Sequence, residues 1–176
     1  MRVYLVGTSG TGKTTLAKRI STNENLAHLE LDSIHHQANW TPLPLEDFKT
    51  EVQRFTSQEA WVIDGNYRQV QDIILSRCST LVILDYSRAV VMRRVIRRTL
   101  GRMLLGTTLW NGNRESWKYL FTRNPDENIV LWAWTTFERR RKEFDALQAA
   151  TPSSVTVYRL NHPKQCKDLL KALYTS

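Results

Sequence analysis

The sequence has few cysteines and no long apolar run. Cys78 and Cys166 are isolated, and no C-x-x-C pair occurs, which argues against a zinc site and against a disulfide framework. No apolar stretch approaches the roughly 20 residues of a membrane-spanning helix, so we expect no membrane partner. Since an apolar strand pattern begins at residue 3, we also expect no signal peptide and a cytoplasmic protein. The 176 residues are expected to form a single domain over 1–176.

Acidic residues are outnumbered by basic ones, 17 against 25, which gives a net charge of +8 and a pI near 9.8. A basic surface is compatible with nucleic-acid binding. An enzyme that handles polyanionic phosphates shows the same excess when its arginines surround its own site. Because many basic residues fall between Arg88 and Arg102, we favour the second interpretation, and the first stays open.

The segment Gly7–Thr14, GTSGTGKT, matches the phosphate-loop pattern G-x-x-x-x-G-K-[ST]. The apolar run at 3–6 precedes it and a helical pattern from Thr15 follows, which is the context that this motif needs. There, backbone N–H groups and the helix N-terminus bind phosphate, Lys13 reaches the β- and γ-phosphates, and the Thr14 hydroxyl takes a Mg²⁺ position. We therefore predict that the chain binds ATP and Mg²⁺, with the nucleotide held by Gly7, Ser9, Gly10, Thr11, Gly12, Lys13, Thr14 and Thr15.

Strand and helix patterns alternate along the chain. Further strands are predicted at 27–31, 61–63, 80–84 and 155–160, and helices at 45–58, 70–75, 88–103, 126–149 and 163–174, the long one with Asp126 as its cap. Residues 35–42 and 104–126 are expected to be irregular. This alternation predicts an α/β fold in which helices cover both faces of a five-stranded parallel sheet.

Asp32, Asp64 and Asp85 each end a predicted strand, as the phosphate loop does. Because ligands of parallel sheets lie beyond the carboxyl ends of the strands, these signals predict one site at one edge of the sheet. Asp85 ends a continuous apolar run and therefore competes with Asp64 as the carboxylate on the Mg²⁺ side.

Two further segments carry a family resemblance. The DGNYR segment at Asp64–Arg68 looks like the D-G-F-P-R of adenylate-kinase-like nucleoside monophosphate kinases, with Asn and Tyr in place of Phe and Pro. The RTLGR segment at Arg98–Arg102 is similar to the R-x-x-G-R that opens their lid. With the phosphate loop, WVIDGNYR at 61–68 and LWNGNRE at 109–115, nearly the whole chain most closely resembles the bacterial topology-modulation proteins, which are adenylate-kinase-like P-loop proteins. The resemblance implies a P-loop NTPase of nucleoside-kinase type, with strand order 2-3-1-4-5 and a lid insertion at about 104–126.

The resemblance also implies roles for single residues. Asp64 would hold Mg²⁺ beside Thr14, and we prefer it to Asp85 because the glycine and arginine after it match the kinase segment. Planar guanidinium groups suit the three oxygens of a transferred phosphoryl group, so Arg68, Arg98 and Arg102 are the candidate clamps, the alternative being a solvated basic face. One of the arginines at 139–141 is a further, unassigned candidate.

Asp32 stands where several small-molecule P-loop kinases place a carboxylate that orients or deprotonates an acceptor hydroxyl; the other interpretation is a turn or helix cap. The adjacent His35 and His36 should point in opposite directions from an extended loop, so contact with the acceptor is favoured over a metal site. Trp110 and Trp117 would stack on a base or pack the lid's own core, and we favour the core.

The sequence therefore predicts Mg²⁺-ATP-dependent phosphoryl transfer to a small acceptor: a nucleotide, a nucleoside or a small hydroxylated metabolite. The candidate catalytic residues are Lys13, Asp32, Arg68, Arg98 and Arg102. Two alternatives are a nucleotide-dependent regulator that binds nucleic acid through helix 88–102, and an NTPase switch without an acceptor. The acceptor, the base preference and the oligomeric state stay open.

Overall fold

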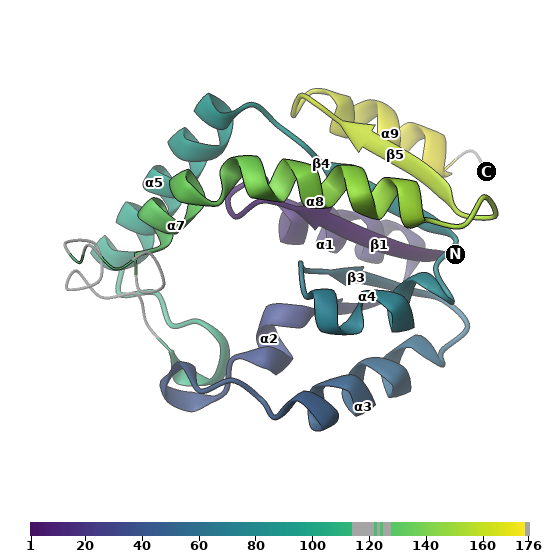
Figure 1. Cartoon of the computed structure of the whole chain (residues 1–176), viewed down its shortest axis with the longest axis horizontal. Helices are drawn as coiled ribbons and strands as arrows, with labels where there is room; N and C mark the ends of the chain where they lie inside the picture. The colour runs from purple at the N-terminus through teal and green to yellow at the C-terminus, as the bar shows by residue number, and fades with distance from the viewer. Residues whose placement is uncertain (114–121, 123, 125–127, 175–176) are drawn as a thin grey trace.

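The computed structural model describes residues 1–113, 122, 124 and 128–174 (Figure 1). Its sheet has five strands in the order β2-β3-β1-β4-β5, all paired in parallel, which confirms the predicted fold class and strand order. The strands are β1 (Arg2–Gly7), β2 (Ala27–Glu30), β3 (Trp61–Asp64), β4 (Thr80–Leu84) and β5 (Thr156–Leu160).

The helices follow the strands in alternation. They are α1 (Lys13–Glu24), α2 (Leu31–His35), α3 (Leu45–Thr56), α4 (Arg68–Leu75), α5 (Arg88–Leu104), α7 (Ile129–Thr135), α8 (Phe137–Ala150) and α9 (Gln165–Tyr174), with single 3-10 turns η1 (Ala38–Trp40) and η2 (Trp110–Gly112). In the part of the chain that the structure describes, no helix is both long and apolar enough to cross a bilayer.

Alternate side chains of β1 serve two separate cores, as the period of a strand requires. Val3 and Leu5 pack with side chains of α1, α5, α7 and α9 on one face of the sheet. Tyr4 and Val6 pack with side chains of α3, α4 and α8 on the other face. In Figure 1, α8 lies on the near side of the sheet and α1 behind it. The two apolar layers hold the carboxyl ends of the strands in place, and the candidate site is built there.

The prediction that the second strand runs to residue 31 and leads into an extended loop is wrong. Strand β2 ends at Glu30, and the chain turns at once into α2, with Asp32 in its first turn. The Ser33 hydroxyl donates to the Glu30 carbonyl at 2.7 Å, and the His36 N–H donates to the Asp32 carbonyl at 3.1 Å. These local bonds favour a helical turn over an extended segment, so Glu30 is the side chain at the end of the strand.

The predicted helix at 126–149 is two helices, α7 and α8, that meet at Thr136. The hydroxyl of Thr136 donates to the Trp132 carbonyl at 2.7 Å, a bond of the kind that bends helices. The cap of α7 is Asn128, whose side-chain oxygen accepts from the N–H groups of Val130 and Leu131, both at 3.1 Å. Asp126 and much of the expected lid at 104–126 lie outside the described residues.

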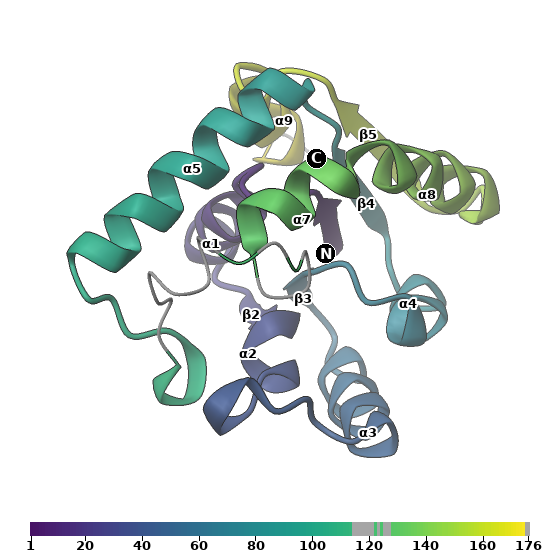
Figure 2. The ribbon, with the colours of Figure 1, turned by 60° about the vertical axis from the view of Figure 1, so that its left-hand side comes forward.

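After α5 the chain returns to α2, as Figure 2 shows. The Asn111 amide donates to the carbonyl groups of Ser33 at 3.2 Å and His36 at 2.6 Å. The segment around η2 is thereby joined to α2, opposite α5, and both flank the phosphate loop.

Candidate active site

The loop between β1 and α1 has the shape of an anion-binding cradle. Gly10 has φ +83°, and a Cβ there would lie 2.5 Å from Val95 Cγ2, so only glycine fits. The Thr11 hydroxyl donates to the Thr8 carbonyl at 2.8 Å and closes the loop on itself. No described side chain caps the N-terminus of α1, so its first N–H groups are free to bind a phosphate.

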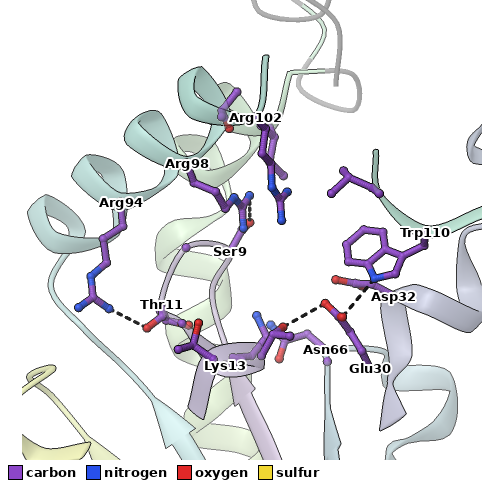
Figure 3. Close-up of a pocket in the computed structure, with 18 of the residues that line it drawn as sticks. Ser9, Thr11, Lys13, Glu30, Asp32, Asn66, Arg94, Arg98, Arg102 and Trp110 are labelled. Atoms are coloured by element: carbon purple, nitrogen blue, oxygen red, sulfur yellow. Dashed lines mark hydrogen bonds between the residues drawn. The ribbon is translucent and has the colours of Figure 1, made fainter. Parts of the chain in front are cut away.

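A cavity of about 1400 Å³ opens from this loop (Figure 3). Single small-molecule sites commonly occupy roughly 300–1000 Å³, so the cavity has room for two ligands. One side consists of the phosphate loop and α5, and the opposite side of residues from β2, α2, η1 and η2. Figure 3 shows Arg94, Arg98 and Arg102 on the first side, and Glu30, Asp32 and Trp110 on the second.

Lys13 lines the cavity at the base of the loop, with Nζ 3.4 Å from the Thr8 carbonyl oxygen. Burial lowers the pKa of Lys13, and the nearby carboxylates of Asp32 and Asp64 act in the opposite direction. An anion beside a buried ammonium group stabilises its charged form, and a bound phosphate would supply such an anion.

The Thr14 hydroxyl lies between two carboxylates. Its oxygen is 2.9 Å from Asp64 Oδ1 and 3.0 Å from Glu30 Oε1, although one hydroxyl hydrogen cannot make a full bond to both. His28 Nε2 holds the second oxygen of Asp64 at 2.8 Å. Hydroxyl and carboxylate oxygens are ligands that Mg²⁺ prefers. The ion usually takes only one or two carboxylates from the protein, and substrate phosphates and water complete its coordination. No cluster of three or more acidic, histidine or cysteine ligands occurs among the described residues, so a metal here would need such a shared shell.

Asp85, the alternative carboxylate, belongs to a different environment. Its side chain is 3% exposed and accepts from Arg159 Nη2 at 2.7 Å and Nε at 3.1 Å, with Arg141 Nε at 3.3 Å. The geometry therefore favours Asp64 over Asp85 at a metal site. Sequence reasoning missed Glu30, because its strand was predicted one residue too long.

Three arginines of α5 line the cavity. Arg94 donates to the Thr11 carbonyl at 2.8 Å, and Arg98 donates to the Ser9 hydroxyl at 3.0 Å. Arg102 is one turn beyond Arg98, as predicted from their spacing. The role of Arg94 was not foreseen, although it lies in the basic segment that drew attention.

Of the arginines at 139–141, Arg140 is the one that lines the cavity. Its side chain is 15% exposed and pairs with Glu143 at 2.8 Å, whereas the side chains of Arg139 and Arg141 are 62% and 50% exposed. The prediction that Arg68 is a clamp beside Arg98 and Arg102 needs correction. It starts α4 as an exposed residue and does not line the cavity among the described residues, so the structure does not bring it to the other predicted clamps.

Asn66 binds the backbone of Gly7 from a neighbouring strand end. Its side-chain oxygen accepts from the Gly7 N–H at 3.1 Å, and its amide donates to the Gly7 carbonyl at 2.6 Å. The residue was noted in the sequence only as a departure from the kinase segment. In the structure it holds the start of the phosphate loop.

The far end of the cavity is acidic and aromatic. The Tyr67 hydroxyl donates to Asp32 Oδ1 at 2.6 Å and lies 3.3 Å from His36 Nε2. Burial, followed by the charge and hydrogen bond of Asp32, raises the pKa of Tyr67, so the phenol stays a donor. Rings of Trp40 and Trp110 lie 5.4 and 6.0 Å from the His36 ring, and Trp110 Nε1 donates to Glu30 at 3.1 Å. The expectation that His35 and His36 diverge is wrong, since α2 brings their rings within 5.0 Å and both line the cavity.

This architecture matches solved kinases over nearly the whole chain. A shikimate kinase from Bacteroides thetaiotaomicron is 15% identical with TM-score 0.55, covering 99% of this chain and 96% of its own. The shikimate kinase from Acinetobacter baumannii in complex with shikimate is 17% identical with TM-score 0.54, over 98% and 92%. A gluconokinase from Sinorhizobium meliloti 1021 is 18% identical with TM-score 0.51, over 98% and 95%. The chain has a P-loop kinase fold. No family model and no curated protein matches the sequence, so the resemblance to topology-modulation proteins stays a prediction.

Proposed function

We propose that this protein is a kinase that transfers a phosphoryl group from Mg²⁺-ATP to the hydroxyl of a small acceptor. The observation that carries the proposal is the cavity shared by two sets of groups. The loop, Lys13 and Thr14 form one end, and Asp32 with its Tyr67 partner forms the other. Neighbours with the same fold are named shikimate kinase and gluconokinase, which supports phosphoryl transfer to a small molecule.

In this proposal Lys13 and the amides of the loop bind the β- and γ-phosphates. Thr14, Asp64 and Glu30 would hold Mg²⁺, which supplies charge neutralisation on the phosphate oxygens. The candidate clamps for the transferred group are Arg98 and Arg102 of α5 and Arg140 of α8, whose side chains line the cavity. Asp32 would orient the acceptor hydroxyl and receive its proton. Catalysis would come from positioning and electrostatics.

The distribution of the arginines supports a small acceptor over nucleic acid. Helix α5 directs Arg94, Arg98 and Arg102 to the cavity, and Arg93 and Arg97 are its exposed arginines. A phosphate-backbone surface would need several arginines on the outer face of the same helix. The chain is proposed to act as a single domain.

The test is ADP release from Mg²⁺-ATP with a panel of nucleosides, nucleoside monophosphates and hydroxylated metabolites. Lys13→Ala should abolish ATP binding and turnover, and Asp32→Asn should remove acceptor stimulation while ATP still binds. Lys167→Ala, an exposed lysine on α9, is the matched control. Unchanged ATP binding in Lys13→Ala would refute the proposal, and acceptor-independent hydrolysis that Asp32→Asn leaves intact would favour an NTPase switch.

A further inference from the structure

We propose that the acceptor is an uncharged, ring-bearing alcohol, such as a nucleoside or a cyclic polyol, and not a nucleoside monophosphate. This inference rests on the proposed kinase function and deepens it. It depends on which charges, donors and rings face the acceptor end of the cavity, which we define as the described lining residues of 30–40, 65–67 and 108–110.

Charge is segregated between the two sides of the cavity (Figure 3). The acceptor end contributes the carboxylates of Glu30 and Asp32, and none of its described lining residues is a lysine or an arginine. The basic lining residues come from α1, α5 and α8. Arg94 and Arg98 are bound to the phosphate loop, and Arg140 is paired with Glu143. Arg102 lies one turn beyond Arg98, on the same side of the cavity as the other arginines of α5 (Figure 3). With Glu30 taken up by Mg²⁺ in the proposed complex, a second phosphate at the acceptor end would still face the Asp32 carboxylate, which is electrostatically unfavourable.

The candidate phosphate clamp Arg68 is not among the described residues that line the cavity. In the D-G-F-P-R segment that this chain resembles, the arginine corresponds to Arg68, which the structure leaves exposed at the start of α4. Its neighbour Tyr67 faces the cavity instead and offers a neutral hydroxyl. Burial lowers the pKa of both His35 and His36, which disfavours the cationic form of these imidazoles at the acceptor end.

Asp32 and Tyr67 suit a hydroxyl group. Asp32 Oδ1 already accepts from the phenol at 2.6 Å, so the carboxylate is held in one orientation. A carboxylate is an acceptor only, and the acceptor's O–H is the donor that complements it. On transfer, the acceptor O–P bond forms, the bond from the γ-phosphorus to the ADP oxygen breaks, and the hydroxyl proton goes to Asp32.

The walls of the acceptor end are aromatic faces. Trp110 stacks on His36 at 25° between planes, and Trp40 meets His36 edge-on at 75°. Trp40 has φ +59°, a strained conformation for a bulky residue, and its N–H donates to Asn113 Oδ1 at 2.9 Å. The Asn113 amide also donates to the Gln37 carbonyl at 2.9 Å. These hydrogen bonds hold Trp40 in its strained conformation, with its indole at this wall, and aromatic walls pack against the faces of rings.

The test uses matched pairs that differ by one phosphate: adenosine and AMP, cytidine and CMP, myo-inositol and inositol 1-phosphate, with shikimate as a charged ring alcohol. Affinity is measured by isothermal titration calorimetry in the presence of a non-hydrolysable ATP analogue and Mg²⁺, and turnover by ADP release. At least one uncharged member should bind tenfold or more tightly than its phosphorylated partner and should stimulate ADP release. Trp110→Ala should weaken that binding at least tenfold, and Trp134→Ala, at a tryptophan that is 52% exposed, should change it less than twofold.

Arg68→Ala separates this inference from the adenylate-kinase-like alternative. It should leave acceptor affinity unchanged, and a tenfold loss would show that Arg68 reaches the acceptor. Preference for the phosphorylated members, preference for shikimate over every uncharged compound, or no response to any uncharged compound would overturn the inference. In each of these cases ATP binding that depends on Lys13 would leave the proposed function standing. Loss of that dependence would instead refute the kinase proposal itself.

Discussion

Replacing Asn66 by alanine tests whether a neighbouring strand end holds the phosphate loop in its binding shape. The side chain makes two hydrogen bonds with the backbone of Gly7, at 3.1 and 2.6 Å. Each such bond contributes about 1 kcal/mol, and leaving both backbone groups without a partner raises the total loss to about 2–4 kcal/mol. In a chain of this size each kcal/mol lowers the Tm by about 2–4 °C, so Asn66→Ala should lower it by roughly 4–16 °C.

The same substitution should weaken ATP binding. A loop that must be ordered on binding loses about tenfold in affinity for every ~1.4 kcal/mol of ordering. The assays are differential scanning calorimetry and calorimetric titration with Mg²⁺-ATP. Asn66→Asp keeps the acceptor for the Gly7 N–H, but its negative charge is repelled by the Gly7 carbonyl oxygen and by the triphosphate. This variant should therefore bind ATP more weakly than the Asn66→Ala variant. Asn23→Ala, which removes one exposed bond to Tyr174, is the control. A native Tm and native ATP affinity in Asn66→Ala would refute the reasoning.

Three further predictions follow from the packing and the charges. Asp85→Asn should destabilise the protein by about 1.5–3 kcal/mol through its partly buried pair with Arg159, while ATP affinity measured by titration stays native; a tenfold loss of affinity would restore Asp85 as a candidate metal carboxylate. In thermal melts without ligand, Gly10→Ala should lower the Tm more than Gly12→Ala, because the nearest atom to an added Cβ lies at 2.5 Å in the first case and 3.6 Å in the second; equal Tm values would contradict the close approach. Because the pKa of His35 is lowered in the fold, the unfolded chain binds more protons than the folded one below about pH 6.5, so the free energy of unfolding should fall on acidification. In urea titrations at pH 5 and 7, His35→Gln should reduce the difference in that free energy between the two pH values. An unchanged difference would argue against burial of His35 as the cause.

The elements that sequence reasoning found were those with strong local signals. The phosphate loop is specified by eight adjacent residues, and apolar runs such as Leu81–Leu84 are typical of buried strands. The edge of the sheet that holds the site also followed, since parallel strands share their carboxyl ends. The strand order came from the family resemblance.

The misses have a common cause. Strand β2 ends at Glu30 and not at the residue before Asp32, and the predicted long helix breaks at Thr136. Both features depend on single hydrogen bonds from a side chain to the backbone, which leave little trace in hydrophobic periodicity. Likewise, three successive arginines at 139–141 look alike in the sequence. Only the rotation of α8 against the sheet decides that Arg140 faces the cavity.

By itself the sequence determined the phosphate-loop motif between β1 and α1, with Lys13 and Thr14 in their places, because the loop's geometry is set by neighbouring residues. The tertiary structure alone decided which carboxylates lie beside Thr14 and which side chains line the far end of the cavity. Thr14 and Asp64 are 50 residues apart in the chain, and Glu30 and Trp110 are 80 apart. Such pairs meet only after the strands have aligned and both faces of the sheet are packed, so no local pattern in the sequence could encode their contact.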